Sequence, residues 1–89
     1  MAEVHFTSWL REVAPKEPAH AAGTTVGEAL ADLFVAEPQV RGYVLDDQGR
    51  LRKHVCIFAD GERLANATAL GHPIGEKSIL YVMQALTGG

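Results

Sequence analysis

The residues with the clearest potential for chemistry are the two glycines, Gly88 and Gly89, that end the sequence. They follow the apolar run 79–83, and a strand that leads into two glycines would present a carboxylate on a narrow stalk. Glycine has no Cβ, so these two residues can pass through a channel in which any side chain would collide with the walls. The sequence therefore predicts that residues 85–89 form a flexible tail and that Gly89 is the reactive residue.

A carboxylate at Gly89 has to be activated before it can react as an electrophile. Transfer of a nucleotidyl group to it would give an acyl adenylate, and a sulfur nucleophile could then displace AMP to leave a thiocarboxylate. The sequence contains no phosphate-binding loop that would hold the nucleotide. We therefore expect no bound cofactor and no catalytic residue in this chain, and we expect ATP to be used by a partner that activates it. The chain would be a substrate and not an enzyme.

The remaining reactive side chains offer a weaker alternative. Cys56 is the single cysteine and lies in the apolar run 55–58, which is typical of a buried thiol on a strand. An enzymatic interpretation would rest on Cys56 and His54 alone. The four histidines do not have the spacing of a zinc site, so no metal ligands are predicted.

Length and composition limit the classes of protein to consider. With 89 residues, 47% of them hydrophobic and 21% charged, the chain is expected to form one domain over residues 1–84. The formal net charge of -3 does not favour nucleic acid as a partner. The short basic cluster in residues 50–54 is expected to be solvated. No apolar run is long enough to span a membrane and no signal peptide is recognised, so the prediction is a cytoplasmic protein without a membrane partner.

Apolar residues at positions 26, 29, 30, 33 and 34 have the spacing of a helix with one buried face. Thr25 and Glu28 fit a capping box, in which the Glu28 carboxylate would accept a hydrogen bond from the backbone amide of Thr25. Pro38 should end the helix, because the residue before a proline avoids helical geometry. The predicted helix covers residues 26–36.

Strands are predicted at residues 3–10, 51–59 and 78–83, with a short or edge strand between 14 and 22. The 51–59 segment is predicted to be a central strand, and Asp60-Gly61 should form a tight turn from it to a short return at 62–64. The last strand reads as an inner strand covered on both faces. This order predicts an α+β fold in which one main helix packs across a mixed sheet of four to five strands.

Three features together resemble the MoaD/ThiS-type small sulfur carriers, which are relatives of ubiquitin with a β-grasp fold. They are the helix opening TVGEAL at 25–30, the stretch GRLRKHVCIFADGE at 49–62, and the terminal Gly88-Gly89. The likeness extends over nearly the whole chain. It implies a β-grasp, ubiquitin-like fold and a role as a sulfur carrier.

The resemblance also implies partners. An adenylyltransferase of the ubiquitin-activating type would adenylate Gly89, and a desulfurase or rhodanese-like sulfur donor would supply the sulfur. An acceptor biosynthetic enzyme would then take it, in a cysteine, molybdopterin, thiamin or specialised-metabolite pathway. Gly88 would be needed for threading, and Thr87 and Leu86 would belong to the inserted tail.

Members of this family dock through an apolar patch on the sheet, and this patch maps onto Met83 and Tyr81. Strand alternation places these two side chains on one face, opposite Leu80 and Val82, which are assigned to the core beneath the helix. The alternative for Tyr81 and Met83 is ordinary packing under a loop.

A second function stays open at this point. The chain could be a ubiquitin-like protein modifier, in which Gly89 forms an isopeptide bond with a lysine, or an interaction module in which it has no chemical role.

Overall fold

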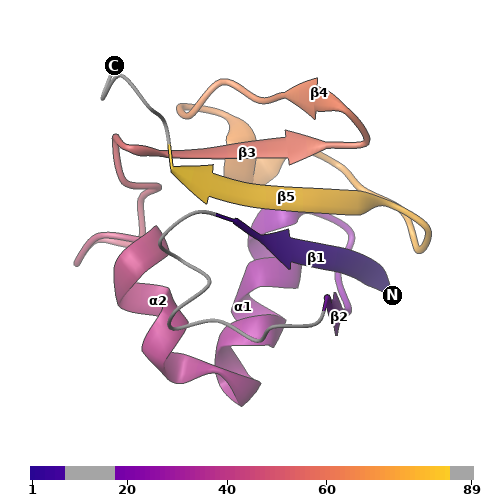
Figure 1. Ribbon diagram of the computed structural model, residues 1–89, viewed down its shortest axis with the longest axis horizontal. Helices are drawn as coiled ribbons and strands as arrows, with labels where there is room; N and C mark the ends of the chain where they lie inside the picture. The colour runs from indigo at the N-terminus through magenta and orange to yellow at the C-terminus, as the bar shows by residue number, and fades with distance from the viewer. Residues whose placement is uncertain (8–17, 85–89) are drawn as a thin grey trace.

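A computed structural model of the chain describes residues 1–7 and 18–84, and a mixed five-stranded sheet organises them (Figure 1). In chain order the elements are β1 (Ala2–Phe6), β2 (Ala19–Ala21), α1 (Val26–Ala36), α2 (Pro38–Val44), β3 (Val55–Ala59), β4 (Glu62–Arg63), the 3-10 helix η2 (Ala69–Gly71) and β5 (Ile79–Gln84). The predicted α+β class, the helix at 26–36 and the edge strand between 14 and 22 are confirmed.

The strands are ordered β2-β1-β5-β3-β4, and only the pair of β1 and β5 is parallel. This mixed sheet, with a helix across it, is the β-grasp arrangement that the sequence predicted. The strand in the middle of the sheet is β5, and β3, from the predicted 51–59 segment, is an inner strand between β5 and β4, as predicted. The chain reaches the middle of the sheet last, because β5 inserts between β1 and β3.

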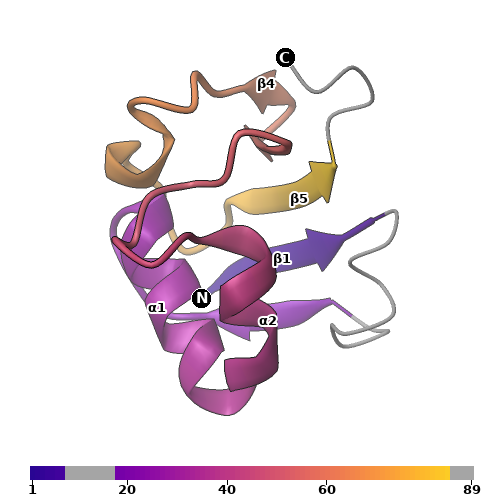
Figure 2. The same cartoon turned by 90° about the vertical axis from the view of Figure 1, so that its left-hand side faces the viewer.

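Both helices lie on the same face of the sheet (Figures 1 and 2). Between the helices and the sheet is one hydrophobic core, to which β5 contributes Leu80 and Val82, both fully buried. Helix α1 contributes Leu30 and β3 contributes Ile57, which are buried to the same degree. Burying each such side chain stabilises the fold by about 1.5–3 kcal/mol, so the inward residues of β5 are a main source of stability.

The start of α1 differs in one detail from the predicted capping box. The Thr25 hydroxyl accepts a hydrogen bond from the Glu28 amide at 3.2 Å, as expected. The Glu28 carboxylate, however, accepts from the backbone amide of Thr24 at 2.8 Å and from the Thr24 hydroxyl at 2.9 Å, and not from the Thr25 amide. These two bonds to Thr24 lower the pKa of Glu28, because they stabilise its charged form.

The main helix across the sheet is α1, as predicted, but the sequence analysis did not predict a second, shorter helix, α2, which follows after a single residue. Glu37 interrupts the first helix with non-helical backbone, at φ -129° and ψ 66°, and Pro38 begins the second. A proline is well tolerated at the first position of a helix, where its missing N–H has no helical partner. Val40 and Val44, one helical turn apart, are both fully buried and attach α2 to the common core.

The predicted strand 51–59 begins only at Val55. The preceding residues form local hydrogen bonds instead: the Asp46 carboxylate accepts from the amides of Gln48 and Arg50, both at 2.9 Å. The bond from the Arg50 amide is the main reason why the pKa of Asp46 is lowered. Arg52 donates its Nε to the carbonyl oxygen of Gly42 at 2.8 Å and so ties this loop to the end of α2. Within the predicted segment, the Arg52 amide donates to the Val44 carbonyl oxygen at 3.0 Å and Leu51 forms an isolated bridge with Leu45, so these residues pair with the end of α2 and not with the sheet.

In the part of the chain that the structure describes, neither helix is long and apolar enough to cross a membrane.

The bonds of Glu28 predict a pH-dependent stability. Since folding lowers its pKa, the carboxylate stabilises the folded chain above its unfolded pKa, and this contribution is lost as the pH falls through the lowered value. Glu28→Gln should therefore lower the thermal midpoint at pH 7. The difference from the unchanged chain should shrink steadily in melts at decreasing pH.

The matched control for that substitution is Glu76→Gln, since the Glu76 side chain is exposed and makes no hydrogen bond to a described residue. It should change the midpoint little at any pH. A deficit of Glu28→Gln that stayed constant down to low pH would contradict this account of the helix start.

Candidate functional site

The end of β5 is the point from which the chain continues to its predicted reactive residue. Gln84, the last residue of β5, pairs with Val55, the first residue of β3, so the chain leaves the sheet at this end (Figure 1). The predicted tail residues Leu86, Thr87, Gly88 and Gly89 lie outside the described residues, and their roles stay predictions.

The two faces of β5 differ in exposure. Leu80 and Val82 are completely buried beneath the helices, whereas Ile79 is 40% and Tyr81 38% exposed on the opposite face. Met83 shares that second face and is partly buried. The predicted alternation of core and outward residues is thus confirmed. The prediction that both faces of the strand are covered was wrong for Ile79 and Tyr81.

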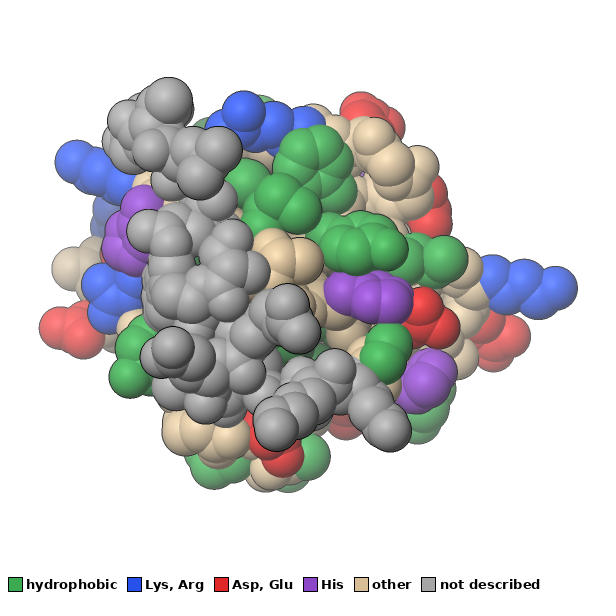
Figure 3. Space-filling view, viewed as in Figure 1, with side chains coloured by type: hydrophobic (Ala, Val, Ile, Leu, Met, Phe, Trp, Pro, Cys, Tyr) green, Lys and Arg blue, Asp and Glu red, His purple; other side chains and the backbone are tan. Residues whose placement is uncertain are grey.

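Cross-strand pairing adds an aromatic residue that the sequence reasoning did not single out. Phe58 of β3 pairs with Tyr81, and Cys56 pairs with Met83, so all four side chains belong to the same face of the sheet. We call Phe58, Ile79, Tyr81 and Met83 the open-face patch; Figure 3 shows hydrophobic side chains gathered there. Alternation within 55–58 could have indicated that Phe58 and Cys56 share a face, but only the register places them beside β5.

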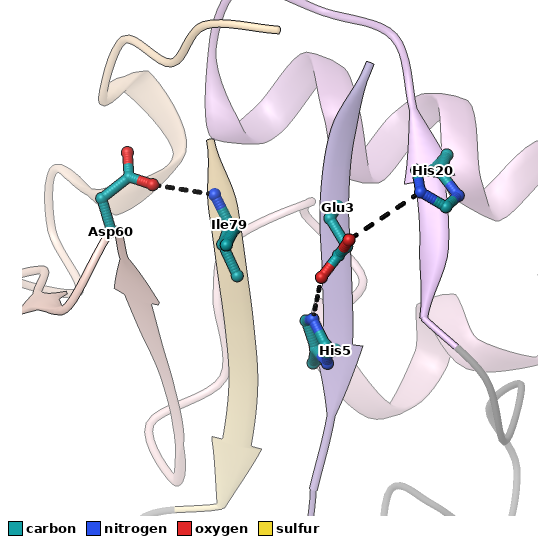
Figure 4. A network of polar contacts seen from close by, with 5 residues as sticks. All are labelled: Glu3, His5, His20, Asp60 and Ile79. Carbon is teal, nitrogen blue, oxygen red and sulfur yellow. Dashed lines mark hydrogen bonds and ion pairs between the residues drawn. The ribbon is translucent and has the colours of Figure 1, made fainter. Parts of the chain in front are cut away.

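A stacked pair borders the open-face patch on the β1 side. The His5 ring lies 4.6 Å from the Tyr81 ring, centroid to centroid, at an interplanar angle of 19°. Nε2 of His5 lies 2.5 Å from one carboxylate oxygen of Glu3, and Nε2 of His20 lies 3.9 Å from the other (Figure 4). Glu3 therefore fixes the His5 ring, and His5 in turn limits the orientations open to Tyr81.

A second polar contact anchors the start of β5. The Asp60 carboxylate accepts a hydrogen bond from the Ile79 amide at 2.8 Å, and the Asp60 amide donates to the Ile79 carbonyl oxygen at 2.9 Å (Figure 4). Asp60 and Gly61 both have positive φ, 51° and 87°, as the predicted tight turn requires. The turn thus holds the strand at the end opposite to the tail.

The enzymatic alternative gains no geometric support. Cys56 is 5% exposed, as predicted for a buried strand thiol, and His54 lies in the turn before β3. A thiolate nucleophile needs access and a stabilising base or cation, and burial of this thiol provides neither. Among residues 1–7 and 18–84, no group of three or more potential ligands could hold a metal ion.

Comparison with solved structures extends this picture. SAMP1 from Haloferax volcanii is 29% identical, with a TM-score of 0.77 over 99% of this chain and 98% of that one. A chain in the BexX/CysO complex from Amycolatopsis orientalis has a TM-score of 0.84 at 19% identity over the full length of both chains. CysO from Mycobacterium tuberculosis has a TM-score of 0.84 at 20% identity, over 97% of this chain and 100% of that one.

No protein-family model matches the sequence, and no curated protein matches it significantly. The structural likenesses nevertheless confirm the β-grasp fold and the predicted resemblance to small ubiquitin-like carrier and modifier proteins.

The two faces of β5 should respond differently to truncation. Leu80→Ala removes a fully buried side chain and should lower the free energy of unfolding by about 3 kcal/mol. Tyr81→Ala removes mainly the stack with His5 and should cost about 1 kcal/mol or less. Urea unfolding of both variants provides the measurement. Equal losses would mean that the outward face is as important for folding as the core.

Proposed function

We propose that this chain is a sulfur carrier protein that is adenylated and then thiocarboxylated at Gly89 and donates sulfur to a biosynthetic enzyme. The observation that carries the proposal is the position of β5: the central strand of a β-grasp sheet ends at Gln84, and the sequence continues with Leu86-Thr87-Gly88-Gly89. Full-length likeness to small ubiquitin-like proteins supports it.

The proposed chemistry needs three steps on the Gly89 carboxylate. A carboxylate oxygen attacks the α-phosphorus of ATP, forming the acyl adenylate and releasing pyrophosphate. Hydrosulfide sulfur then attacks the acyl carbon, AMP leaves, and the S–H proton goes to solvent, which yields the thiocarboxylate. In the last step the thiocarboxylate sulfur displaces a leaving group from the acceptor enzyme's substrate, and water cleaves the resulting thioester, which releases the thiol product and restores the Gly89 carboxylate. Nucleotide binding and proton transfer belong to the partners, and this chain supplies the carboxylate.

The proposal assigns three kinds of partner. They are an adenylyltransferase of the ubiquitin-activating type, a desulfurase or rhodanese-like sulfur donor, and an acceptor biosynthetic enzyme. The complex of CysO with BexX supports a role that is exerted through partner proteins. We place this activity in the cytoplasm, without nucleic acid or membrane as a partner.

Docking of these partners is assigned to the open-face patch. Tyr81 and Met83, the two residues predicted for docking, belong to it, and Tyr81 is exposed without being needed for the core. The patch occupies the strand from which the chain continues to Gly89, so a protein bound over it would be close to the reactive carboxylate. Large exposed aromatic and aliphatic side chains that gather on one face are typical of protein interaction sites.

A second candidate is a ubiquitin-like protein modifier that forms an isopeptide bond between Gly89 and a lysine. The specific observation in its favour is the likeness to the small archaeal modifier protein 1 of Haloferax volcanii, at 28–29% identity. Both functions share the acyl adenylate, and they differ in the nucleophile that attacks it.

Intact mass spectrometry distinguishes the two functions. We expect that incubation with the source organism's adenylyltransferase of the ubiquitin-activating type, ATP and sulfide shifts the chain by the mass difference between sulfur and oxygen, located at Gly89. A covalent adduct to a lysine of another protein would indicate the modifier. A chain left unchanged by the active enzyme, with or without sulfide, would count against both.

A further prediction concerns the proposed entry of the tail into a narrow channel of the adenylyltransferase. Gly88→Val places a branched side chain where a narrow channel must close around the backbone, so adenylation, measured as ATP–pyrophosphate exchange, should fall below about one hundredth of the unchanged rate. Because the substitution lies beyond β5, the thermal midpoint should stay within about 1 °C of the original.

The control is Thr87→Ser, which keeps a small polar residue in the same tail and should retain most of the exchange activity. Normal exchange with Gly88→Val would show that the tail does not enter a tight channel.

A further inference from the structure

Charged side chains surround the open-face patch. The carboxylates near it are paired within the chain, whereas a cation on the β4 side has no partner among the described residues. On the β4 edge, Arg63 pairs with Phe58, so its side chain lies on the same face as the patch. Arg63 is exposed, and its side chain makes no hydrogen bond or ion pair within residues 1–7 and 18–84. Figure 3 shows Lys or Arg side chains along the upper border of the hydrophobic cluster.

The carboxylates near this face are engaged within the chain. Glu3, on β1 at the other side of β5, contacts both His5 and His20. Asp60 accepts a hydrogen bond from the Ile79 amide. Glu62 is adjacent to Arg63 on β4, but it pairs with Ala59, so alternation directs it to the other face of the sheet. The face therefore presents, beside its aromatic centre, a cation that has no partner in the described part of the chain.

A second exposed cation lies at the end of the sheet from which the chain continues to Gly89. Lys53 precedes β3, whose first residue pairs with the last residue of β5, and it makes no ion pair with a described residue. The nearby Asp46 carboxylate is occupied by the amides of Gln48 and Arg50. The chain as a whole has a net charge of -3. The two cations Arg63 and Lys53, which form no ion pair with a described residue, therefore have the sign opposite to that of the chain as a whole.

We infer that the open-face patch binds a protein partner whose apolar surface is bordered by acidic side chains, with a carboxylate opposite Arg63. This inference rests on the proposed function, because it specifies the chemistry of the partner that docks there. A cation at the rim of an apolar contact contributes by steering the encounter and by rejecting partners with positive charge at the same position. Arg63 thus acts as a specificity residue for docking and takes no part in the chemistry at Gly89.

The test is a charge reversal with a control of identical charge change. Arg63→Glu alters the rim of the patch, whereas Lys77→Glu makes the same change at an exposed residue just before β5, at the end opposite to the tail. Binding of the full chain to the source organism's adenylyltransferase is measured without ATP, so that docking is separated from adenylation. Thermal melts of both variants verify that they remain folded.

Arg63→Glu should raise Kd about tenfold at about 0.1 M salt, and Lys77→Glu should raise it less than about twofold. Arg63→Lys, which keeps the charge, should bind nearly as well as the unchanged chain. The gap between the two reversals should narrow at about 0.5 M salt, because rim charges are screened.

Equal effects of the two reversals would overturn the inference and leave the proposed function standing. Suppose that binding without ATP depends on Arg63 but the chain is never adenylated when ATP is added. That result would support the inference and count against the proposed function. Failure of the unchanged chain to bind would overturn the inference. So would a sedimentation experiment in which the unchanged chain self-associates and the Arg63→Glu variant does not, because the face would then bind a second copy of this chain.

Discussion

The structure depends on the insertion of β5 between β1 and β3. This strand provides the only parallel pair of the described sheet, with β1, and the antiparallel pair with β3, and its inward side chains Leu80 and Val82 complete the core beneath both helices. Nearly all of the sheet's order follows from this placement. Because β1 and β5 are far apart in sequence, their pairing is a non-local contact whose loop-closure entropy opposes folding until the pair forms.

The same strand separates the core from the proposed docking surface. Its period of two assigns alternate residues to the core and to the open face, so Leu80 and Tyr81 are neighbours in sequence but lie on opposite faces of the sheet. A side chain on the open face can therefore be adapted to a partner at little cost to folding. That division suits a small protein whose proposed chemistry occurs in the active sites of other proteins.

Local polar contacts hold the ends of the elements in place. Glu28 binds Thr24 at the start of α1, Asp60 binds Ile79 at the start of β5, and Asp46 closes the loop after α2. Each of these carboxylates accepts a hydrogen bond from a backbone amide, and in two cases this lowers the pKa of the acid. These three acidic residues thus serve the chain's own architecture, and the inferred role of Arg63 in docking depends on a cation that has no partner among the described residues.

The sequence alone determined the features that depend on local spacing. The bounds of α1, the Asp60-Gly61 turn, the last strand and the shared face of Tyr81 and Met83 follow from helical and strand periodicity and from turn chemistry, which neighbouring residues specify. Only the tertiary structure decided what neighbours in space impose. These features are a second helix beginning at Pro38, a third strand shortened because Leu51 and Arg52 pair with the end of α2, and the contacts of Tyr81 with His5 and Phe58. Strand order and register join segments far apart in the chain, and no local pattern encodes which of them will meet.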